Sequence, residues 1–286
     1  MSVIKLLRPK HWIKNFFVFI PLLMSGYGEN INEVQKVLIL FLTFCMVSSI
    51  VYILNDIKDV KKDKNHPVKK FRPIACGDIS SIQAVFIALF LAIIVLYVAF
   101  IYLNISTQTI LFLYLLMNIF YSFGLKNLPI IDVTIISIGF ILRVCSGAFV
   151  LDLPISFWLI SVTFSISMML AIGKRHYEHI HFRNLETRKT TLISDGYSEN
   201  FNQQAILFFS ISTFVFYSLY VFNNFSENYI FLFTIIFVSF GLLRYLQLFS
   251  TNNLLEEPTQ LVYKDMQILT SVCLWVLCTT FSLYWV

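Results

Sequence analysis

Long apolar stretches separated by short polar ones dominate the chain. Nine such stretches are present, and most have the ~17–25 residues that a helix needs to cross the hydrocarbon core of a bilayer. The pattern therefore predicts an all-α integral membrane protein with nine transmembrane helices. The first stretch is short and contains Pro21, so we expect it to be kinked or tilted. The predicted segments are 14–26, 34–57, 82–103, 107–124, 130–151, 155–173, 203–222, 228–249 and 267–286.

Composition and charge support this class and predict an orientation. Hydrophobic residues make up 58% of the chain and charged residues only 13%, which excludes an ordinary soluble protein. If the spans alternate, all of the 21 Lys and Arg residues except Lys36 and Arg143 fall on one side. The positive-inside rule then predicts a cytoplasmic N-terminus and an outside C-terminus. We expect a single membrane domain over residues 1–286.

The net charge of +5 does not indicate a nucleic-acid partner, because the basic residues are dispersed among membrane loops and form no nucleic-acid motif. They instead predict a positive rim on the cytoplasmic side. Such a rim attracts lipid head groups or a phosphorylated substrate. The expected partners are therefore the membrane and a phosphorylated substrate, and not a nucleic acid.

Four polar residues with oxygen ligands lie at the end of the second apolar segment. In a helix, Asn55, Asp56, Asp59 and Asp63 occupy an arc about 100° wide and so face one direction. One amide and three carboxylates suit Mg²⁺, which takes oxygen ligands and commonly bridges to substrate phosphates. The alternative is a solvated helix end whose Asp and Lys residues pair locally.

Four basic groups flank the predicted spans on the same side as this acidic cluster. The prolines at 67 and 73 shape a loop that is expected to return Arg72 toward the carboxylates. An arginine there can bind a phosphate through two hydrogen bonds. The groups are Arg8, Lys10 and Lys14; Lys69, Lys70 and Arg72; Lys126; and Lys174, Arg175 and Tyr177.

Two charges belong to the fifth apolar segment. Asp132 and Arg143 would lie about 20° apart in angle and roughly 16 Å apart along a helix. Arg143 is too deep to reach water, so we expect it to face protein or a hydrated cavity, with a structural role or a substrate contact both open. Asp132 is expected to act as a helix-start residue.

The run Asn55-Asp56-x-x-Asp59-x-x-x-Asp63 resembles the first aspartate-rich motif of the UbiA-type intramembrane prenyltransferases. The resemblance covers essentially the whole chain. It implies a helical bundle around a central cavity that opens toward the bilayer, with the polar site at the cytoplasmic mouth. Typical members carry a second aspartate-rich motif after the sixth span. Here that position reads Lys174-Arg175-His176-Tyr177-Glu178 instead.

With this departure, the chain resembles one branch of the family, the decaprenyl-phosphate phosphoribosyltransferases. The motifs that carry the likeness are Arg8-Pro9-Lys10-His11-Trp12, Lys70-Phe71-Arg72-Pro73 and Tyr121-Ser122-x-Gly124-Leu125-Lys126. The resemblance implies transfer of phosphoribose from phosphoribosyl diphosphate (PRPP) to a polyprenyl phosphate. Three anionic groups in one site require more cations and fewer carboxylates than prenyl transfer does.

The resemblance also implies roles for individual residues and a place in the cell. The expected location is a bacterial-type inner membrane, with the site on the cytoplasmic side and the product used for cell-wall or surface-glycan synthesis. The nearer alternative is a UbiA-type enzyme that moves a prenyl group to an aromatic or lipid acceptor. A transporter is a distant third, because Arg143 is the only charge deep inside a predicted span. The expected roles are Mg²⁺ binding for Asn55, Asp56, Asp59 and Asp63; catalysis for Asp56, Asp59 and Lys126; PRPP phosphate binding for Lys58, Arg72 and Lys126; binding of the 5-phosphate or the acceptor phosphate for Lys174, Arg175 and Tyr177; and binding of the lipid phosphate for Arg8, Lys10 and Lys14.

Overall fold

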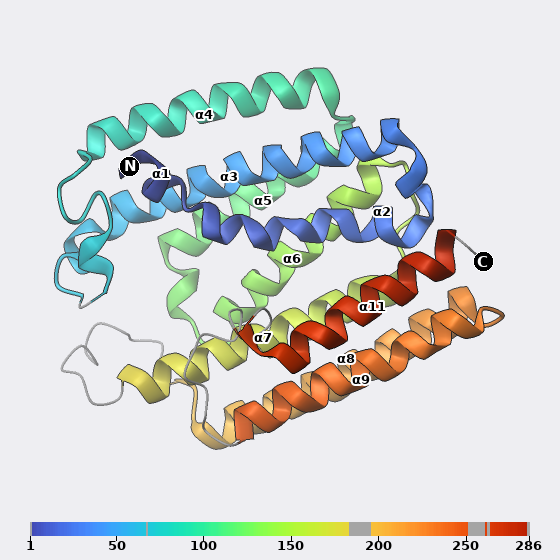
Figure 1. The fold of residues 1–286 in the computed structure, drawn as a ribbon. Coiled ribbons are helices and arrows are strands. Elements are labelled where there is room, and N and C mark those ends of the chain that lie inside the picture. Colours follow the sequence, from blue (N-terminus) through green and yellow to red (C-terminus); the bar gives the residue numbers. More distant parts are fainter. Residues whose placement is uncertain (1, 67, 183–195, 251–260, 262–263, 285–286) are drawn as a thin grey trace. The chain divides into compact units, whose positions relative to one another are not determined.

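A computed structural model describes residues 2–66, 68–182, 196–250, 261 and 264–284 (Figure 1). All regular secondary structure in this part of the chain is helical, as predicted. The chain divides into two compact units, and the single domain expected from the sequence stays a prediction. Unit 1 comprises Met1–Leu22, Tyr27–Leu125 and Leu142–Pro154, and unit 2 comprises Leu23–Gly26, Lys126–Ile141 and Ile155–Val286.

Unit 1 is built on α3, a helix of 33 residues that packs against α4, α5 and the N-terminal segment. Asn30 begins this helix by accepting a hydrogen bond from the backbone N–H of Asn32. Leu40 and Phe44 on this helix are completely buried in the core of the unit. The elements of unit 1 are α1 (Ser2–Leu7), η1 (Pro9–Phe19), η2 (Tyr27–Glu29), α3 (Ile31–Asp63), η3 (Lys69–Phe71), α4 (Ser81–Tyr102) and α5 (Ile105–Phe123).

The first predicted span is not a single α-helix. Its residues form η1, an 11-residue 3₁₀ helix, followed by α2 (Ile20–Ser25). Pro9 at the start of η1 and Pro21 near the start of α2 lack the N–H that a continuous helix would use. With ~2.0 Å of rise per 3₁₀ residue and ~1.5 Å per α residue, the pair still reaches about 30 Å.

Eight described helices are long and apolar enough to cross a membrane: α3 to α9 and α11. The chain is therefore a multi-pass membrane protein, while the ninth span and the orientation of the termini stay predictions. Helix α4 illustrates the lipid-facing pattern, because only 17% of its most apolar window is buried and Phe86, Phe90 and Phe100 are exposed. A bilayer accommodates such apolar faces, whereas every backbone polar group must be bonded within the helix.

Unit 2 is a series of helices that pack in chain order. Helix α7 lies against α8, α8 against α9, and α9 against α11. Helix α8 begins at Ser198, whose hydroxyl accepts a hydrogen bond from the backbone N–H of Phe201. Helices α2 and α6 each contribute residues to both units. The remaining elements are η4 (Leu125–Asn127), α6 (Ile131–Val150), α7 (Phe157–Phe182), α8 (Glu199–Phe225), α9 (Tyr229–Ser250) and α11 (Met266–Tyr284).

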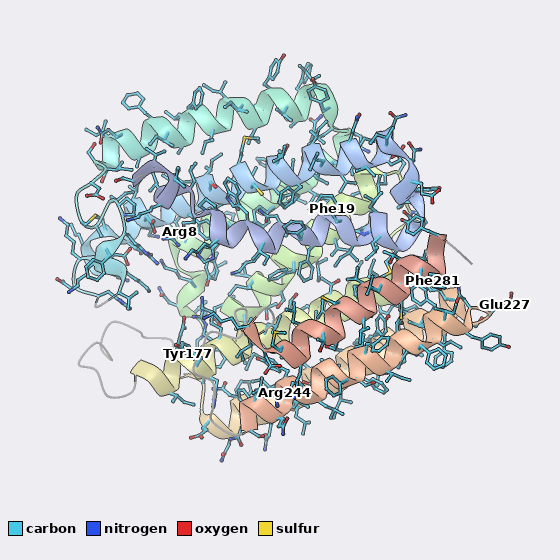
Figure 2. The ribbon with its side chains drawn as sticks, viewed as in Figure 1. Arg8, Phe19, Tyr177, Glu227, Arg244 and Phe281 are labelled. Carbon is cyan, nitrogen blue, oxygen red and sulfur yellow. The ribbon has the colours of Figure 1, made fainter. Side chains whose placement is uncertain are left out.

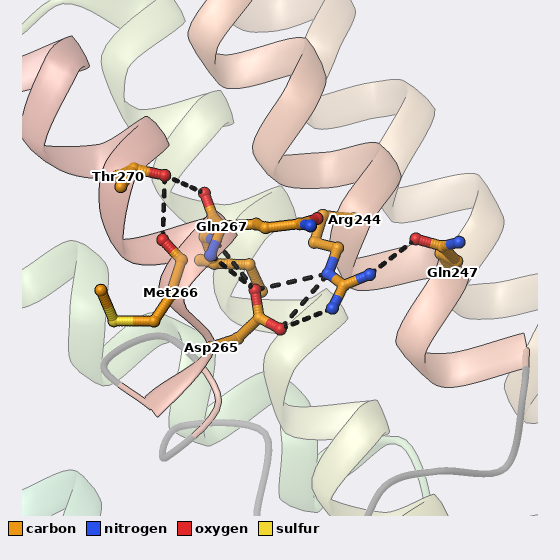
Figure 3. A network of polar contacts seen from close by, with 7 residues as sticks. Arg244, Gln247, Asp265, Met266, Gln267 and Thr270 are labelled. Carbon is orange, nitrogen blue, oxygen red and sulfur yellow. Dashed lines mark hydrogen bonds and ion pairs between the residues drawn. The ribbon is translucent and has the colours of Figure 1, made fainter.

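A polar network joins α9 to the start of α11 (Figure 3). Nη2 of Arg244 donates to Oδ2 of Asp265 at 2.9 Å, and this hydrogen bond is the main reason why the pKa of Asp265 lies below its usual range. Oδ1 of Asp265 accepts hydrogen bonds from the backbone N–H groups of Gln267 and Ile268. One carboxylate therefore caps α11 and pairs with α9.

Replacing Asp265 with alanine is expected to lower the free energy of unfolding by about 1–2 kcal/mol, because the helix loses its cap and Arg244 loses its partner. Asp265→Asn is the matched control, since an amide oxygen still caps the helix. Thermal unfolding in detergent should rank the proteins as wild type, then D265N, then D265A. Equal midpoints for all three would show that this contact does not stabilise the unit.

Candidate functional site

The acidic cluster at the end of α3 contains two buried carboxylates bridged by an arginine. Asp56 is 2% exposed and Asp63 is 4% exposed. Nη1 of Arg72 lies 3.1 Å from Oδ1 of Asp56 and 2.5 Å from Oδ2 of Asp63. Because the two aspartates are about 20° apart on one helix face, a single guanidinium can reach both.

The connection after α3 brings Arg72 back to that helix, as predicted. The 3₁₀ turn η3 ends at Arg72, whose backbone N–H donates to the carbonyl of Lys69. The carbonyl of Arg72 then accepts a hydrogen bond from the N–H of Cys76 at 2.9 Å. Pro73 follows in the buried start of the next turn, while Pro67 lies outside the described residues. The local backbone therefore fixes where Arg72 enters the site.

Arg8 also reaches the acidic cluster, which the sequence did not predict. Its Nη2 donates to Oδ1 of Asp56 at 2.5 Å, and its guanidinium lies over the Tyr52 ring, 5.0 Å from the centroid. Arg8 occupies the junction of α1 and η1, labelled in Figure 2, with a left-handed backbone (φ 53°). That conformation costs a non-glycine residue about 1–2 kcal/mol. The surrounding contacts must therefore offset it.

Those contacts attach the N-terminal segment to α3. The Ser49 hydroxyl donates to the carbonyl of Leu7 at 2.9 Å, and the Trp12 indole N–H donates to the Ser49 hydroxyl at 3.1 Å. The three residues predicted to bind the lipid phosphate therefore lie in different environments. Arg8 points at Asp56, Lys10 is exposed, and Lys14 is half-buried.

The predicted metal ligands do not form a preorganised metal site in the described residues. Within the described chain, no three His, Cys, Asp or Glu side chains come together as a potential metal site. Asn55 and Asp59 are half-buried on the same helix. One observation nevertheless suits a cation: Oδ2 of Asp56 is buried and accepts no hydrogen bond from the described residues. A buried carboxylate oxygen in that state is costly unless a positive group approaches it.

Lys58 has a different environment from the one predicted. Its Nζ donates to the carbonyl of Ser122 at 2.7 Å and lies 3.9 Å from the centroid of the Phe123 ring. A cation at this place satisfies a carbonyl in the last turn of α5 and complements the helix dipole. A phosphate contact by Lys58 would require this hydrogen bond to break.

Unit 2 contains a second arginine between two carboxylates. Nε of Arg175 donates to Oδ2 of Asp132 at 2.6 Å, and its Nη1 donates to Oε2 of Glu178 at 2.7 Å. Asp132 is completely buried and also accepts a hydrogen bond from the Tyr197 hydroxyl at 2.5 Å. Burial, and then this bond to Asp132, raise the pKa of the Tyr197 phenol. Ile130 completes the cluster by donating its backbone N–H to the same hydroxyl at 2.7 Å.

Asp132 was predicted only as a helix-start residue, and Tyr197 was not predicted at all. Asp132 does lie in the first turn of α6, but its carboxylate is used in tertiary contacts. The available sequence signal was an isolated acidic residue at the start of an apolar run. The other predicted residues of unit 2, Lys126 on η4 and Lys174 and Tyr177 on α7, are half-buried, and Tyr177 is labelled in Figure 2.

Arg143 lies in the core of unit 1 and has a structural role there. Its Nε donates to Oδ1 of Asn15 at 2.8 Å and its Nη2 donates to the Tyr114 hydroxyl at 2.7 Å. The amide of Asn15 in turn donates to Ser48 at 3.2 Å. These bonds connect η1, α3, α5 and α6. Of the two possibilities left open by the sequence, the hydrogen-bonding role is observed.

Comparison with known proteins gives concordant results. The sequence model of the UbiA prenyltransferase family matches residues 16–285. Decaprenyl-phosphate phosphoribosyltransferase from Mycolicibacterium smegmatis is 35% identical over 181 residues, which cover 62% of this chain and 57% of that protein. The protein of the same name from Corynebacterium glutamicum is 34% identical over 180 residues, which cover 62% of this chain and 54% of that protein. Each match therefore spans little more than half of the relative.

The fold has a counterpart among solved structures. A UbiA homolog from Archaeoglobus fulgidus, solved with GPP and Mg²⁺ bound, superposes with a TM-score of 0.73. The superposition covers 99% of this chain and 98% of that chain, at 16% sequence identity. At such low identity the likeness concerns the fold alone. The predicted UbiA-like helical fold is confirmed.

Proposed function

Because the chain belongs to the UbiA prenyltransferase family, we propose that it is a membrane transferase that moves 5-phosphoribose from PRPP to a polyprenyl phosphate. The products are polyprenylphosphoryl-5-phosphoribose and diphosphate. The observation that carries this proposal is the 35% and 34% identity to two proteins named decaprenyl-phosphate phosphoribosyltransferase. The replacement of the family's second aspartate-rich motif by Lys174-Arg175-His176-Tyr177-Glu178 supports the same choice.

The charge of the described residues supports an anionic donor and an anionic acceptor. Arg8 and Arg72 meet at Asp56, so two guanidinium groups are available near the end of α3. Guanidinium groups bind phosphates through paired hydrogen bonds. We assign Arg72 and Lys126 to the diphosphate of the donor. Lys174, Arg175 and Tyr177 are assigned to the 5-phosphate or the acceptor phosphate, and Lys10 and Lys14 to the lipid phosphate at the membrane surface.

Asp56 and Asp63 would hold Mg²⁺, together with Asn55 and Asp59. The buried Oδ2 of Asp56 supports this, because it accepts no hydrogen bond from the described part of the chain. Mg²⁺ prefers carboxylate and carbonyl oxygens and is commonly shared between protein and phosphate. When bound, it would supply Lewis-acid stabilisation of the leaving diphosphate.

The transfer breaks the bond between ribose C1 and a diphosphate oxygen, and the electron pair leaves with the diphosphate. An oxygen of the lipid phosphate forms the new bond to C1 from the opposite face, so inversion is the expected outcome. That oxygen is already ionised at neutral pH, so no strong general base is required. The task of the chain's own residues is to orient the phosphates and stabilise the leaving charge, in which Lys126 is the assigned cation.

We place the reaction on the cytoplasmic side of a bacterial-type inner membrane. The concentration of Lys and Arg in the loops on one side of the spans supports this orientation. PRPP is soluble and charged, so its site must be open to water, whereas the polyprenyl tail belongs in lipid. The product would serve cell-wall or surface-glycan synthesis.

A prenyl transfer is the second candidate, favoured by the structural likeness to a UbiA homolog that was solved with GPP bound. A donor assay separates the two. Membranes containing the protein, supplied with labelled PRPP and a polyprenyl phosphate, are expected to yield a labelled lipid that is absent without the protein. Labelled product from a prenyl diphosphate and an aromatic acceptor, with none from PRPP, would reverse the assignment.

A further inference from the structure

The guanidinium of Arg72 occupies a position that normally suits a metal ion. Its Nη1 alone contacts both Asp56 and Asp63, at 3.1 and 2.5 Å. The side chains of these aspartates are 2% and 5% exposed, so water offers them little competing solvation. A divalent cation bound between Oδ1 of Asp56 and Oδ2 of Asp63 would lie where Nη1 lies. Arg72 and such a cation therefore compete for one position.

The two arginines of the cluster are held differently. Arg8 contacts Asp56 only, among the described carboxylates, and its guanidinium also lies over the ring of Tyr52 on α3. Arg72 belongs to the connection between α3 and α4, and its side chain is 25% exposed. Arg72 is thus more accessible than Arg8, and it is the arginine that bridges Asp56 and Asp63.

We propose that Arg72 couples metal binding to donor binding. Without a donor, Arg72 neutralises Asp56 and Asp63 and opposes the entry of a cation. A diphosphate offers the planar guanidinium a second anionic partner with matching geometry. Arg72 then turns to the diphosphate and the two carboxylates accept the metal. The proposal rests on the proposed function only in that the donor carries a diphosphate.

The competing explanation is a permanent structural bridge. Buried ion pairs are costly to break from one side, because the remaining charge is left without a partner. If Arg72 is only such a bridge, its removal leaves two buried carboxylates in repulsion and disorganises the end of α3. Metal binding would then weaken together with stability. If Arg72 is the coupling residue, its removal strengthens metal binding in the absence of diphosphate. The two explanations predict opposite signs.

The test measures Mn²⁺ binding to the full-length protein in detergent by electron paramagnetic resonance, with and without inorganic diphosphate. Mn²⁺ suits carboxylate sites as Mg²⁺ does. For the wild type, diphosphate is expected to tighten Mn²⁺ binding about fivefold or more, the usual lower range of coupling between sites. Arg72→Gln is expected to bind Mn²⁺ alone about fivefold or more tightly than the wild type, with little further effect of diphosphate.

Lys70→Gln is the matched control, because it removes one positive charge from the same connection at an exposed residue. It is expected to behave as the wild type. Arg72→Lys keeps the charge without the planar fork and is expected to bind Mn²⁺ alone as weakly as the wild type but with reduced coupling. Weaker or unchanged Mn²⁺ binding by R72Q without diphosphate would overturn the proposal. Because no ribose or prenyl group is involved, this result is independent of the donor assay.

Discussion

Asp56→Asn is expected to reduce transfer activity about a hundredfold or more. The substitution keeps the size of the side chain but removes the charge that holds Arg8 and Arg72 at 2.5 and 3.1 Å. It also removes one of the two buried carboxylates assigned to the metal. The loss should appear in the rate of lipid labelling at saturating PRPP and Mg²⁺, measured against protein of known amount.

Asp78→Asn is the control for this experiment, since Asp78 is an exposed carboxylate in the connection after Arg72 and contacts only the Ser2 hydroxyl among the described hydrogen bonds. It should retain wild-type activity. Thermal unfolding of both variants separates a catalytic loss from a loss of folded protein. An Asp56→Asn enzyme with activity close to that of Asp78→Asn would remove Asp56 from the site.

Gly147→Ala is expected to lower the free energy of unfolding by about 3 kcal/mol or more. Gly147 lies on α6 where the backbone of η1 crosses it, and a Cβ atom there would come within 2.1 Å of the carbonyl oxygen of Val18. The opposing group is backbone, so it cannot rotate away. Alanine is the better helix former by roughly 0.5–1 kcal/mol, but this gain is much smaller than the cost of the clash.

The measurement is the yield of folded protein in detergent and its unfolding midpoint. Gly124→Ala serves as the control, because nothing lies within 4 Å of a Cβ atom at Gly124. It should be nearly neutral. A stable Gly147→Ala protein would show that η1 can move away from α6, and that the close approach of the two elements is not needed for folding.

The candidate site was partly readable from the sequence because some of its geometry is local. Helical periodicity alone places Asp56 and Asp63 on one face of α3. The short connection after α3, with Pro73 directly following Arg72, was enough to predict that Arg72 returns to the carboxylates. The length of each apolar run likewise predicted α3 to α9 and α11 as candidate spans. These features depend on neighbours within a few turns of the chain.

The features that were missed depend on distant partners. Arg8 and Asp56 are 48 positions apart, and Asp132 lies 43 positions from Arg175 and 65 from Tyr197. No local pattern marks such pairs, since each partner lies on a different element. For the same reason the sequence assigned Lys58 to a phosphate, whereas packing of α3 on α5 brings it to the carbonyl of Ser122.

The sequence by itself determined the class of protein, the apolar helices and the acidic face of α3, because the periodicity of apolar and polar residues follows from helix geometry. Only the tertiary structure decided which charges pair over long distances in the sequence. It brought Arg8 to Asp56, paired Arg175 with Asp132, and buried Arg143 beside Asn15. The reason is physical: a buried charge must find a partner, and helix packing decides which residues are within reach.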